Sequence, residues 1–296
     1  MTSTKRIKIL LADDGSRHAQ SAVELLREIS LPPKSRIMVL RVFTPGQISS
    51  IPEFEKSLER TKDQFLKAGI AAETDLILGS PSEKIIEIAE TKKSDLIVVG
   101  AKGLRATLGI LLGGVAQQVV EYAHCPVLVV RASYQGLRRI LLVTDGSSYS
   151  QQAARYLGKF PLPDKVDVRV IHVVPPLRPP VMVEPTPVGW QPMYVPLLTE
   201  EEETALQKKQ EHKGQALLKR TCDLLQRNGI ASTPVLKWGD AATEIIEYVK
   251  SNKFDLIVAG SRGLSQFKGW WVGSVSRKLV HYSNCSVLIV KKPKKE

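Results

Sequence analysis

Residues 260–276 read GSRGLSQFKGWWVGSVS and directly follow FDLIVA, an apolar run with the composition of a buried strand. A strand that ends on glycine and leads to a helix opening at Gly273 and Ser274 brings free backbone N–H groups to the start of that helix. Those groups, with the positive end of the helix dipole, attract anions. The stretch therefore predicts a phosphate-binding loop at a strand end, with an ordinary capped loop as the alternative.

Three residues of this stretch have expected roles. Gly263 permits a positive φ and close approach of the backbone. Ser274 is expected to cap the helix, to donate to a phosphate oxygen, or to do both in different states. Arg277 lies in the first helical turn, where a positive charge opposes the helix dipole, and this indicates a negatively charged ligand nearby.

The chain contains the same unit twice. Two pairs of segments align: residues 9–26 with 140–157, at an offset of 131 positions, and residues 93–130 with 253–290, at an offset of 160. The second unit therefore carries 29 extra residues, which lie between Val173 and Gly229. A repeat of this length indicates two duplicated domains and not a solenoid.

We expect the first domain, copy one, at residues 1–133 and the second, copy two, at residues 134–296. A proline-rich insert at about 175–199 is predicted to be a surface loop, because proline interrupts helices and central strands. Within each copy, strands and helices alternate. In copy one the expected strands are 5–12, 36–43, 72–78, 95–100 and 126–132, and the expected helices are 16–29, 53–68, 80–92 and 113–123. Strands that are apolar throughout, alternating with amphipathic helices, predict an α/β fold with a parallel sheet covered on both faces.

Composition excludes several classes of protein. Apolar residues make up 43% and charged residues 24%, which is globular composition, and the apolar runs have the length of strands and not of membrane spans. The three cysteines form no CxxC pair, and the N-terminus lacks the pattern of a secretory signal, so a cytoplasmic location is expected. The net charge is +12, but the basic residues are scattered, so we do not expect a nucleic-acid partner.

Other nucleotide and catalytic motifs are missing from the sequence. It contains no GxxxxGK[ST], no GxGxxG after the first strand and no GxSxG, which argues against the corresponding nucleotide-binding and hydrolase sites. The five histidines do not pair with acids at metal-ligand spacing, so no metal site and no catalytic residue is assigned.

The spacing G-x2-G-x9-G-[S/T], filled by Gly260, Gly263, Gly273 and Ser274, resembles the signature of the ATP-binding universal stress proteins. The resemblance covers both copies apart from the insert, and it implies two tandem flavodoxin-like, Rossmann-like domains, each with a five-stranded parallel sheet. It also implies a site in copy two, with Thr144 and Asp145 against adenine and ribose, Val173 on the adenine, Gly260 and Gly263 at the ribose and α-phosphate, and Gly273, Ser274 and Ser276 at the β- and γ-phosphates. Arg262 and Val275 belong to the same expected site.

Copy one departs from this pattern. The resemblance gives it the nucleotide-site residues Asp14, Val42, Gly100, Gly103 and Gly113, but Gly114 and Ala116 stand where copy two has its hydroxyls. A hydrogen bond to a charged group contributes roughly 1.5–3 kcal/mol, so losing two weakens binding by on the order of 100-fold. Asp13 adds a second carboxylate, whereas Lys102 and Arg105 are candidates to compensate. We expect copy two to bind ATP well and copy one weakly or not at all.

The resemblance implies a cytoplasmic stress-response protein that senses ATP or is stabilised by it, with Mg²⁺ carried on the phosphates as an open alternative. No general base is evident, so we expect at most a weak ATPase. A scaffold protein that does not use nucleotide is the competing reading. The resemblance also implies that the terminal strands at 126–132 and 286–292 pair as an intramolecular pseudo-dimer, and a homodimer of chains stays open. Trp270 and Trp271 are candidates to anchor a partner, to cover the nucleotide or to pack locally.

Overall fold

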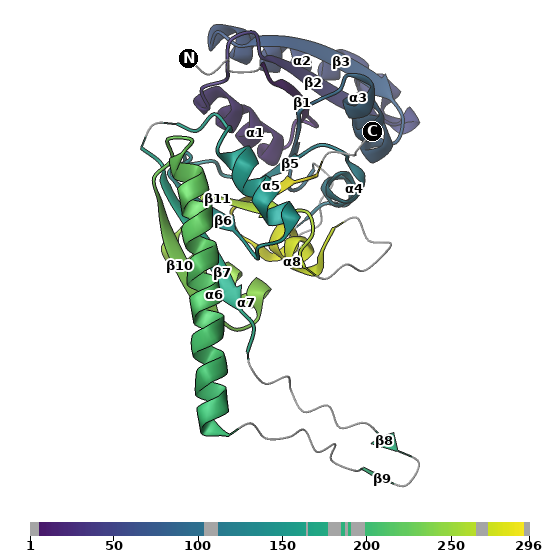
Figure 1. The fold of residues 1–296 in the computed structure, drawn as a ribbon. Helices are drawn as coiled ribbons and strands as arrows, with labels where there is room; N and C mark the ends of the chain where they lie inside the picture. Colours follow the sequence, from purple (N-terminus) through teal and green to yellow (C-terminus); the bar gives the residue numbers. More distant parts are fainter. Residues whose placement is uncertain are drawn as a thin grey trace.

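The computed structural model describes residues 6–103, 112–163, 165–176, 185–186, 189–190, 199–264 and 272–292 (Figure 1). Trp270, Trp271, Arg105 and most of the proline-rich insert lie outside these described residues. Among the described residues, no helix combines the length and the apolar character needed to cross a membrane.

Copy one alternates strands and helices as expected. Its elements are β1 Lys8–Ala12, α1 Arg17–Glu28, β2 Arg36–Phe43, the 3-10 helix η1 Pro45–Ser50, α2 Ile51–Lys67, β3 Ala71–Leu78, α3 Pro81–Thr91, β4 Leu96–Gly100, α4 Gly114–Tyr122 and β5 Val127–Val130. The strands lie in the order β3-β2-β1-β4-β5, and all neighbouring pairs are parallel. The predicted five-stranded parallel sheet is therefore confirmed for this half.

Copy two repeats the arrangement. Its elements are β6 Arg139–Val143, α5 Ser148–Leu157, β7 Asp167–Val174, β8 Pro185–Thr186, β9 Gly189–Trp190, α6 Glu200–Gln226, β10 Ser232–Trp238, α7 Ala241–Asn252, β11 Leu256–Gly260, α8 Ser274–Tyr282 and β12 Ser286–Val290. Its main sheet has the order β10-β7-β6-β11-β12, again parallel. The short strands β8 and β9, which fall in the insert, pair antiparallel with each other.

The two halves share one sheet. β5 and β12 pair antiparallel, with Leu128 opposite Leu288, and join the two parallel sheets into a continuous sheet of ten strands. This is the pairing of terminal strands that the family resemblance implied.

Each face of this sheet carries its own apolar core, because successive side chains of a strand point to opposite faces. On β1, Ile9 and Leu11 join the core under α1, α2, α5 and α6, whereas Leu10 joins the core under α3, α4, α7 and α8. The helices fit these faces because their apolar residues recur at helical spacing. The long helix α6 has 27 residues and extends well past the edge of the sheet (Figure 1), a feature that the sequence reading did not predict.

Candidate functional site

Each copy has a cleft at the carboxyl ends of its strands. In copy two the cleft lies over the ends of β6 and β11, and in copy one over the ends of β1 and β4. In both halves the chain order of the strands reverses between these two neighbours, which is the position where open parallel sheets bind ligands.

The cleft of copy two contains every residue predicted for this half. It has a volume of about 100 Å³, and its lining includes Thr144, Asp145, Val173, Gly260, Arg262, Gly263, Gly273, Ser274, Val275 and Ser276. Residues that lie far apart in the sequence thus meet because the first strand, the second strand and the loop before α8 all end at the same edge of the sheet.

Two glycines of the motif make room for neighbouring groups. A Cβ on Gly260 would lie 2.6 Å from the backbone carbon of Tyr149, so only glycine lets the start of α5 pack against the end of β11. A Cβ on Gly263 would lie 2.8 Å from Oδ2 of Asp145. Gly263 does not use the positive φ that glycine permits, because its φ lies outside the left-handed region. Glycine is required there by the close approach of the Asp145 carboxylate.

The start of α8 differs from the expectation. Gly273 is the N-cap, and Ser274 is the first helical residue, so Ser274 does not cap the helix. The Ser274 side chain is exposed, and its hydroxyl has no hydrogen-bond partner among the described residues. It stands beside the first N–H groups of the helix, which have no partner within the helix. These donors are available to an anion in the cleft.

Ser276 has a different role from Ser274. Its hydroxyl donates to the backbone oxygen of Gly260 at 2.7 Å, and the residue is only 6% exposed. A hydroxyl has one proton to donate, so in this arrangement Ser276 ties α8 to the end of β11 and does not donate to a ligand.

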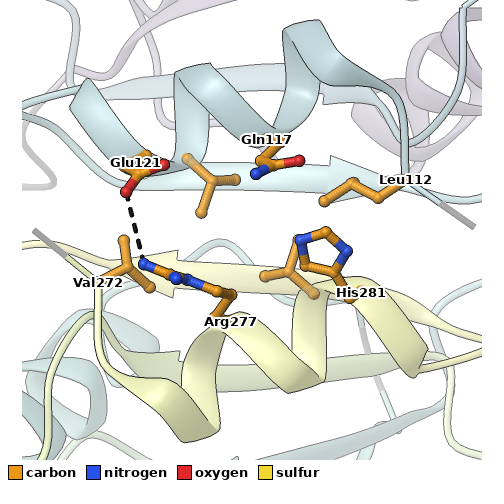
Figure 2. Close-up of a pocket in the computed structure, with 8 residues that line it drawn as sticks. Leu112, Gln117, Glu121, Val272, Arg277 and His281 are labelled. Carbon is orange, nitrogen blue, oxygen red and sulfur yellow. Dashed lines mark hydrogen bonds and ion pairs between the residues drawn. The ribbon is translucent and has the colours of Figure 1, made fainter. Parts of the chain in front are cut away.

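Arg277 has a protein partner instead of the expected ligand. Its Nη2 lies 3.5 Å from Oε1 of Glu121, which belongs to α4 of copy one. Figure 2 shows the two side chains pointing toward each other across the facing helices α4 and α8, beside a small cavity of about 20 Å³. The charge of Arg277 therefore serves the contact between the two halves.

The turn after β6 is held by hydrogen bonds within the protein. Asp145 Oδ1 accepts from the backbone N–H of Ser147 at 2.9 Å, and Nδ1 of His172 lies 2.9 Å from the backbone oxygen of Thr144. His172 and Ser150 also line the cleft, and the sequence reading did not assign them to it. A polar residue near the carboxyl end of an apolar parallel strand, as His172 is on β7, was the signal that could have identified it.

The cleft of copy one is larger, with a volume of about 420 Å³. Its lining includes the five predicted residues Asp14, Val42, Gly100, Gly103 and Gly113, together with Gly114 and Ala116 at the positions of the missing hydroxyls. The glycines repeat the geometry of copy two, since a Cβ on Gly100 would lie 2.8 Å from the His18 Cβ and one on Gly103 would lie 2.6 Å from Asp14 Oδ2. The larger volume of this half was not predicted.

Asp13, which the sequence reading expected to disfavour phosphate, is satisfied by the protein. It is 2% exposed, and its two oxygens accept from the Gly15 N–H and from the Thr61 hydroxyl, each at 2.8 Å. Among the described residues, no group of three or more His, Cys, Asp or Glu side chains could hold a metal ion.

Comparison with known proteins identifies the repeated unit. The model of the universal stress protein family matches residues 6–131 and again residues 136–291. A universal stress protein of Thermus aquaticus, encoded in the 3′ region of the QAH/OAS sulfhydrylase gene, is 37% identical over 133 residues, which cover 42% of this chain and 97% of that protein.

One solved structure agrees with the fold over nearly the whole chain, and a second aligns with less than half of it. A universal stress protein from Archaeoglobus fulgidus aligns over 98% of this chain and 99% of its own, with a TM-score of 0.65 and 20% sequence identity. A universal stress protein solved in complex with cAMP aligns over 43% of this chain and 98% of its own, with a TM-score of 0.37 and 27% identity. On the two family matches, which together span most of the sequence, the chain belongs to the universal stress protein family as a tandem, two-domain member.

Proposed function

We propose that this chain is a cytoplasmic, ATP-binding stress-response protein in which copy two, residues 134–296, holds the nucleotide. The observation that carries the proposal is the start of α8, where the Ser274 hydroxyl and the first helix N–H groups line the same cleft as Asp145 and Val173. Within the part of the chain that the structure describes, that hydroxyl has no hydrogen-bond partner. Donors at a helix N-terminus suit phosphate oxygens, and an apolar strand end suits a base.

The residues of the cleft fit the parts of ATP. Val173 and Ile245 offer an apolar surface for adenine, Asp145 offers a carboxylate for a ribose hydroxyl, and Ser274 offers a donor to a phosphate. Mg²⁺ would enter on the phosphates, since the described residues offer no metal cluster of their own.

We expect ATP to act as a sensed or stabilising ligand and to be hydrolysed slowly or not at all. Oδ1 of Asp145 accepts the Ser147 N–H, and Nδ1 of His172 is bonded to a backbone oxygen, so both groups are engaged in holding the turn. A ligand that binds only the folded state raises its stability by mass action.

The volume of the copy-two cleft favours a second candidate function. Ligand pockets usually enclose about 300–1,000 Å³, whereas this cleft has about 100 Å³. A scaffold protein that uses the fold without nucleotide would have no need of a larger cleft.

Isothermal titration of the full chain with ATP and Mg²⁺ separates the two functions. We expect one strong site per chain, and we expect Ser274→Gly, which gives copy two the glycine found at position 114, to weaken it about tenfold to a hundredfold. Ser148→Gly provides a matched control, because Ser148 is likewise an exposed first residue of a helix, α5, but lies outside the lining of the cleft.

Two equal sites per chain would overturn the assignment to copy two. No binding at all would favour the scaffold. Release of ATP into the supernatant of the heat-denatured protein provides an independent check.

A further inference from the structure

The cleft of copy one contains a charged compartment that copy two lacks. The alignment of the two halves puts Arg41 at the position of His172 and Asp13 at the position of Thr144. Both Arg41 and Asp13 line the copy-one cleft. The two exchanges place a cation and an anion where copy two has an imidazole and a hydroxyl.

The Arg41 guanidinium makes a cation–π contact on one side and fits against a glycine on the other. Its guanidinium carbon lies 4.5 Å from the centroid of the Phe54 ring. Its Nη2 lies 2.5 Å from the point that a Cβ of Gly15 would occupy, and Gly15 has a φ of 79°. A larger residue at position 15 would displace the guanidinium, so the turn and Arg41 are matched to each other.

The guanidinium has N–H donors for which the described part of the chain offers no acceptor. Arg41 is only 6% exposed, and among the described residues it forms no hydrogen bond or ion pair. Both oxygens of Asp13 are already engaged, by Gly15 and by Thr61. Guanidinium carries five N–H donors, and a largely buried charge of this kind needs an acceptor to offset its loss of water. Because Arg41 lines the cleft, a ligand in the cleft can supply that acceptor.

The rest of the cleft indicates which kind of molecule would carry this acceptor. Its lining is largely apolar and includes Val42, Ile85, Leu112 and Val115. The volume of about 420 Å³ lies in the range of small-molecule pockets. A triphosphate suits it less well than the cleft of copy two, because Gly114 stands where copy two has the hydroxyl of Ser274.

We propose that the copy-one cleft binds a small molecule with one oxyanion group, carboxylate or phosphoryl, on an apolar body, and that Arg41 binds the oxyanion. This site is separate from the nucleotide site of copy two and does not depend on it.

Calorimetric titration of the full-length protein with phenyl phosphate, benzoate and uncharged benzyl alcohol tests the proposal. We expect one site for at least one of the two anions, with benzyl alcohol binding about tenfold more weakly or worse, since a charge-assisted bond is lost. The anion that binds more tightly identifies the preferred group. Arg41→Met should weaken anion binding by a similar factor, whereas the matched substitution in copy two, His172→Met, should leave it unchanged.

The proposal is overturned if neither anion binds the wild-type protein at millimolar concentration, or if Arg41→Met binds like the wild type. Equal losses in Arg41→Met and His172→Met would overturn it as well. If circular dichroism shows that Arg41→Met is unfolded, the ¹⁵Nε signal of Arg41 in the wild-type protein decides, because a bound oxyanion shifts that signal and a ligand elsewhere does not.

Discussion

At the scale of single residues, glycine is suited to each position of the repeated motif for a different physical reason. Gly260 allows the backbone of α5 to approach β11, and Gly263 leaves space for the carboxylate of Asp145. Gly273 serves as an N-cap, and a Cβ there would meet its nearest neighbour at 3.4 Å, close to an ordinary contact. The three glycines of one spaced pattern therefore serve three purposes: backbone packing, space for a carboxylate and the start of a helix.

These reasons predict different costs of substitution. Gly260→Ala would force a methyl group into backbone atoms that cannot move independently, and we expect it to lower the free energy of unfolding by about 1–3 kcal/mol or more. Gly273→Ala, the control, should cost less, about 1 kcal/mol or under. Urea denaturation measures both. Equal losses would contradict the assignment of separate roles.

The difference between the two copies predicts a gain of function. A Cβ at Gly114 would meet nothing within 4 Å, so Gly114→Ser can be accommodated without strain. It restores the hydroxyl that copy two has in Ser274, and we expect ATP affinity in copy one to rise about tenfold. Titration in a Ser274→Gly background isolates copy one. An unchanged affinity would mean that the hydroxyl at this position does not bind phosphate.

At the scale of elements, each half caps a helix of the other. Arg131, which follows β5, donates to the backbone oxygen of Val280 at 2.7 Å near the end of α8. Lys291, which follows β12, donates to the backbone oxygens of Val120 at 2.6 Å and Glu121 at 3.2 Å, at the end of α4. Cations suit helix C-termini, where backbone oxygens lack partners. The strand pairing and the two caps thus stabilise the same contact, the one between copy one and copy two.

The cap made by Lys291 predicts a dependence on pH. Burial lowers the pKa of Lys291 from 10.5 to about 8. A lysine whose pKa is lowered by folding favours the folded state above its unfolded pKa, and that contribution is lost as the pH falls through the folded pKa. At 1.36 kcal/mol per unit, we expect the stability of the wild type relative to Lys291→Met to rise by at most about 3 kcal/mol from below pH 8 to pH 10.5.

The wild type is compared with Lys291→Met because other groups titrate in the same pH range. Burial raises the pKa of the Cys125 thiol to about 11 and that of the Cys285 thiol to about 12, and both effects lower stability as the pH rises above the unfolded thiol pKa. They are common to the wild type and to Lys291→Met, so the difference in unfolding free energy cancels most of them. Lys292→Met, at the exposed neighbouring position, provides the matched control for the loss of one lysine at this end of the chain.

At the scale of the whole molecule, the two halves behave as a pseudo-dimer within one chain. The ten-stranded sheet has β3 and β10 at its two edges, while β5 and β12 lie in its middle and are paired on both sides. Separating the halves would expose an unpaired, apolar strand edge on each, and such edges associate with other strands.

Copy one alone is therefore expected to self-associate. Residues 1–133 expressed as a separate protein would expose β5, and we expect it to dimerise through that strand in place of β12. Sedimentation equilibrium measures its mass, and Leu128→Pro, which breaks the strand edge, should reduce the association. A monomeric copy one at high concentration would contradict the expectation.

Much of the fold could be predicted from local pattern. The strand predicted at residues 36–43 is β2, Arg36–Phe43, and the helix predicted at 80–92 is α3, Pro81–Thr91, because proline and the apolar periodicity mark these boundaries directly. The length of α6 was not predicted, because the extra residues of copy two were assigned to a proline-rich surface loop before it. Of the alternatives predicted for Ser274, capping is excluded, because Gly273, one position earlier, is the N-cap.

The sequence by itself determined the duplication and the order of strands and helices, since both follow from the repeat and from hydrophobic periodicity, and it placed the spaced glycines at a strand end. The pairing of the terminal strands and the remaining residues of the site were implied by the family resemblance of those motifs. Only the tertiary structure decided how those residues are used. Ser276 bonds to the Gly260 oxygen and Arg277 pairs with Glu121, whereas Arg41 lies in a cleft without a hydrogen-bond or ion-pair partner among the described residues. The physical reason is that the partner of a polar group depends on side-chain directions and distances between segments far apart in the chain, which no local pattern encodes.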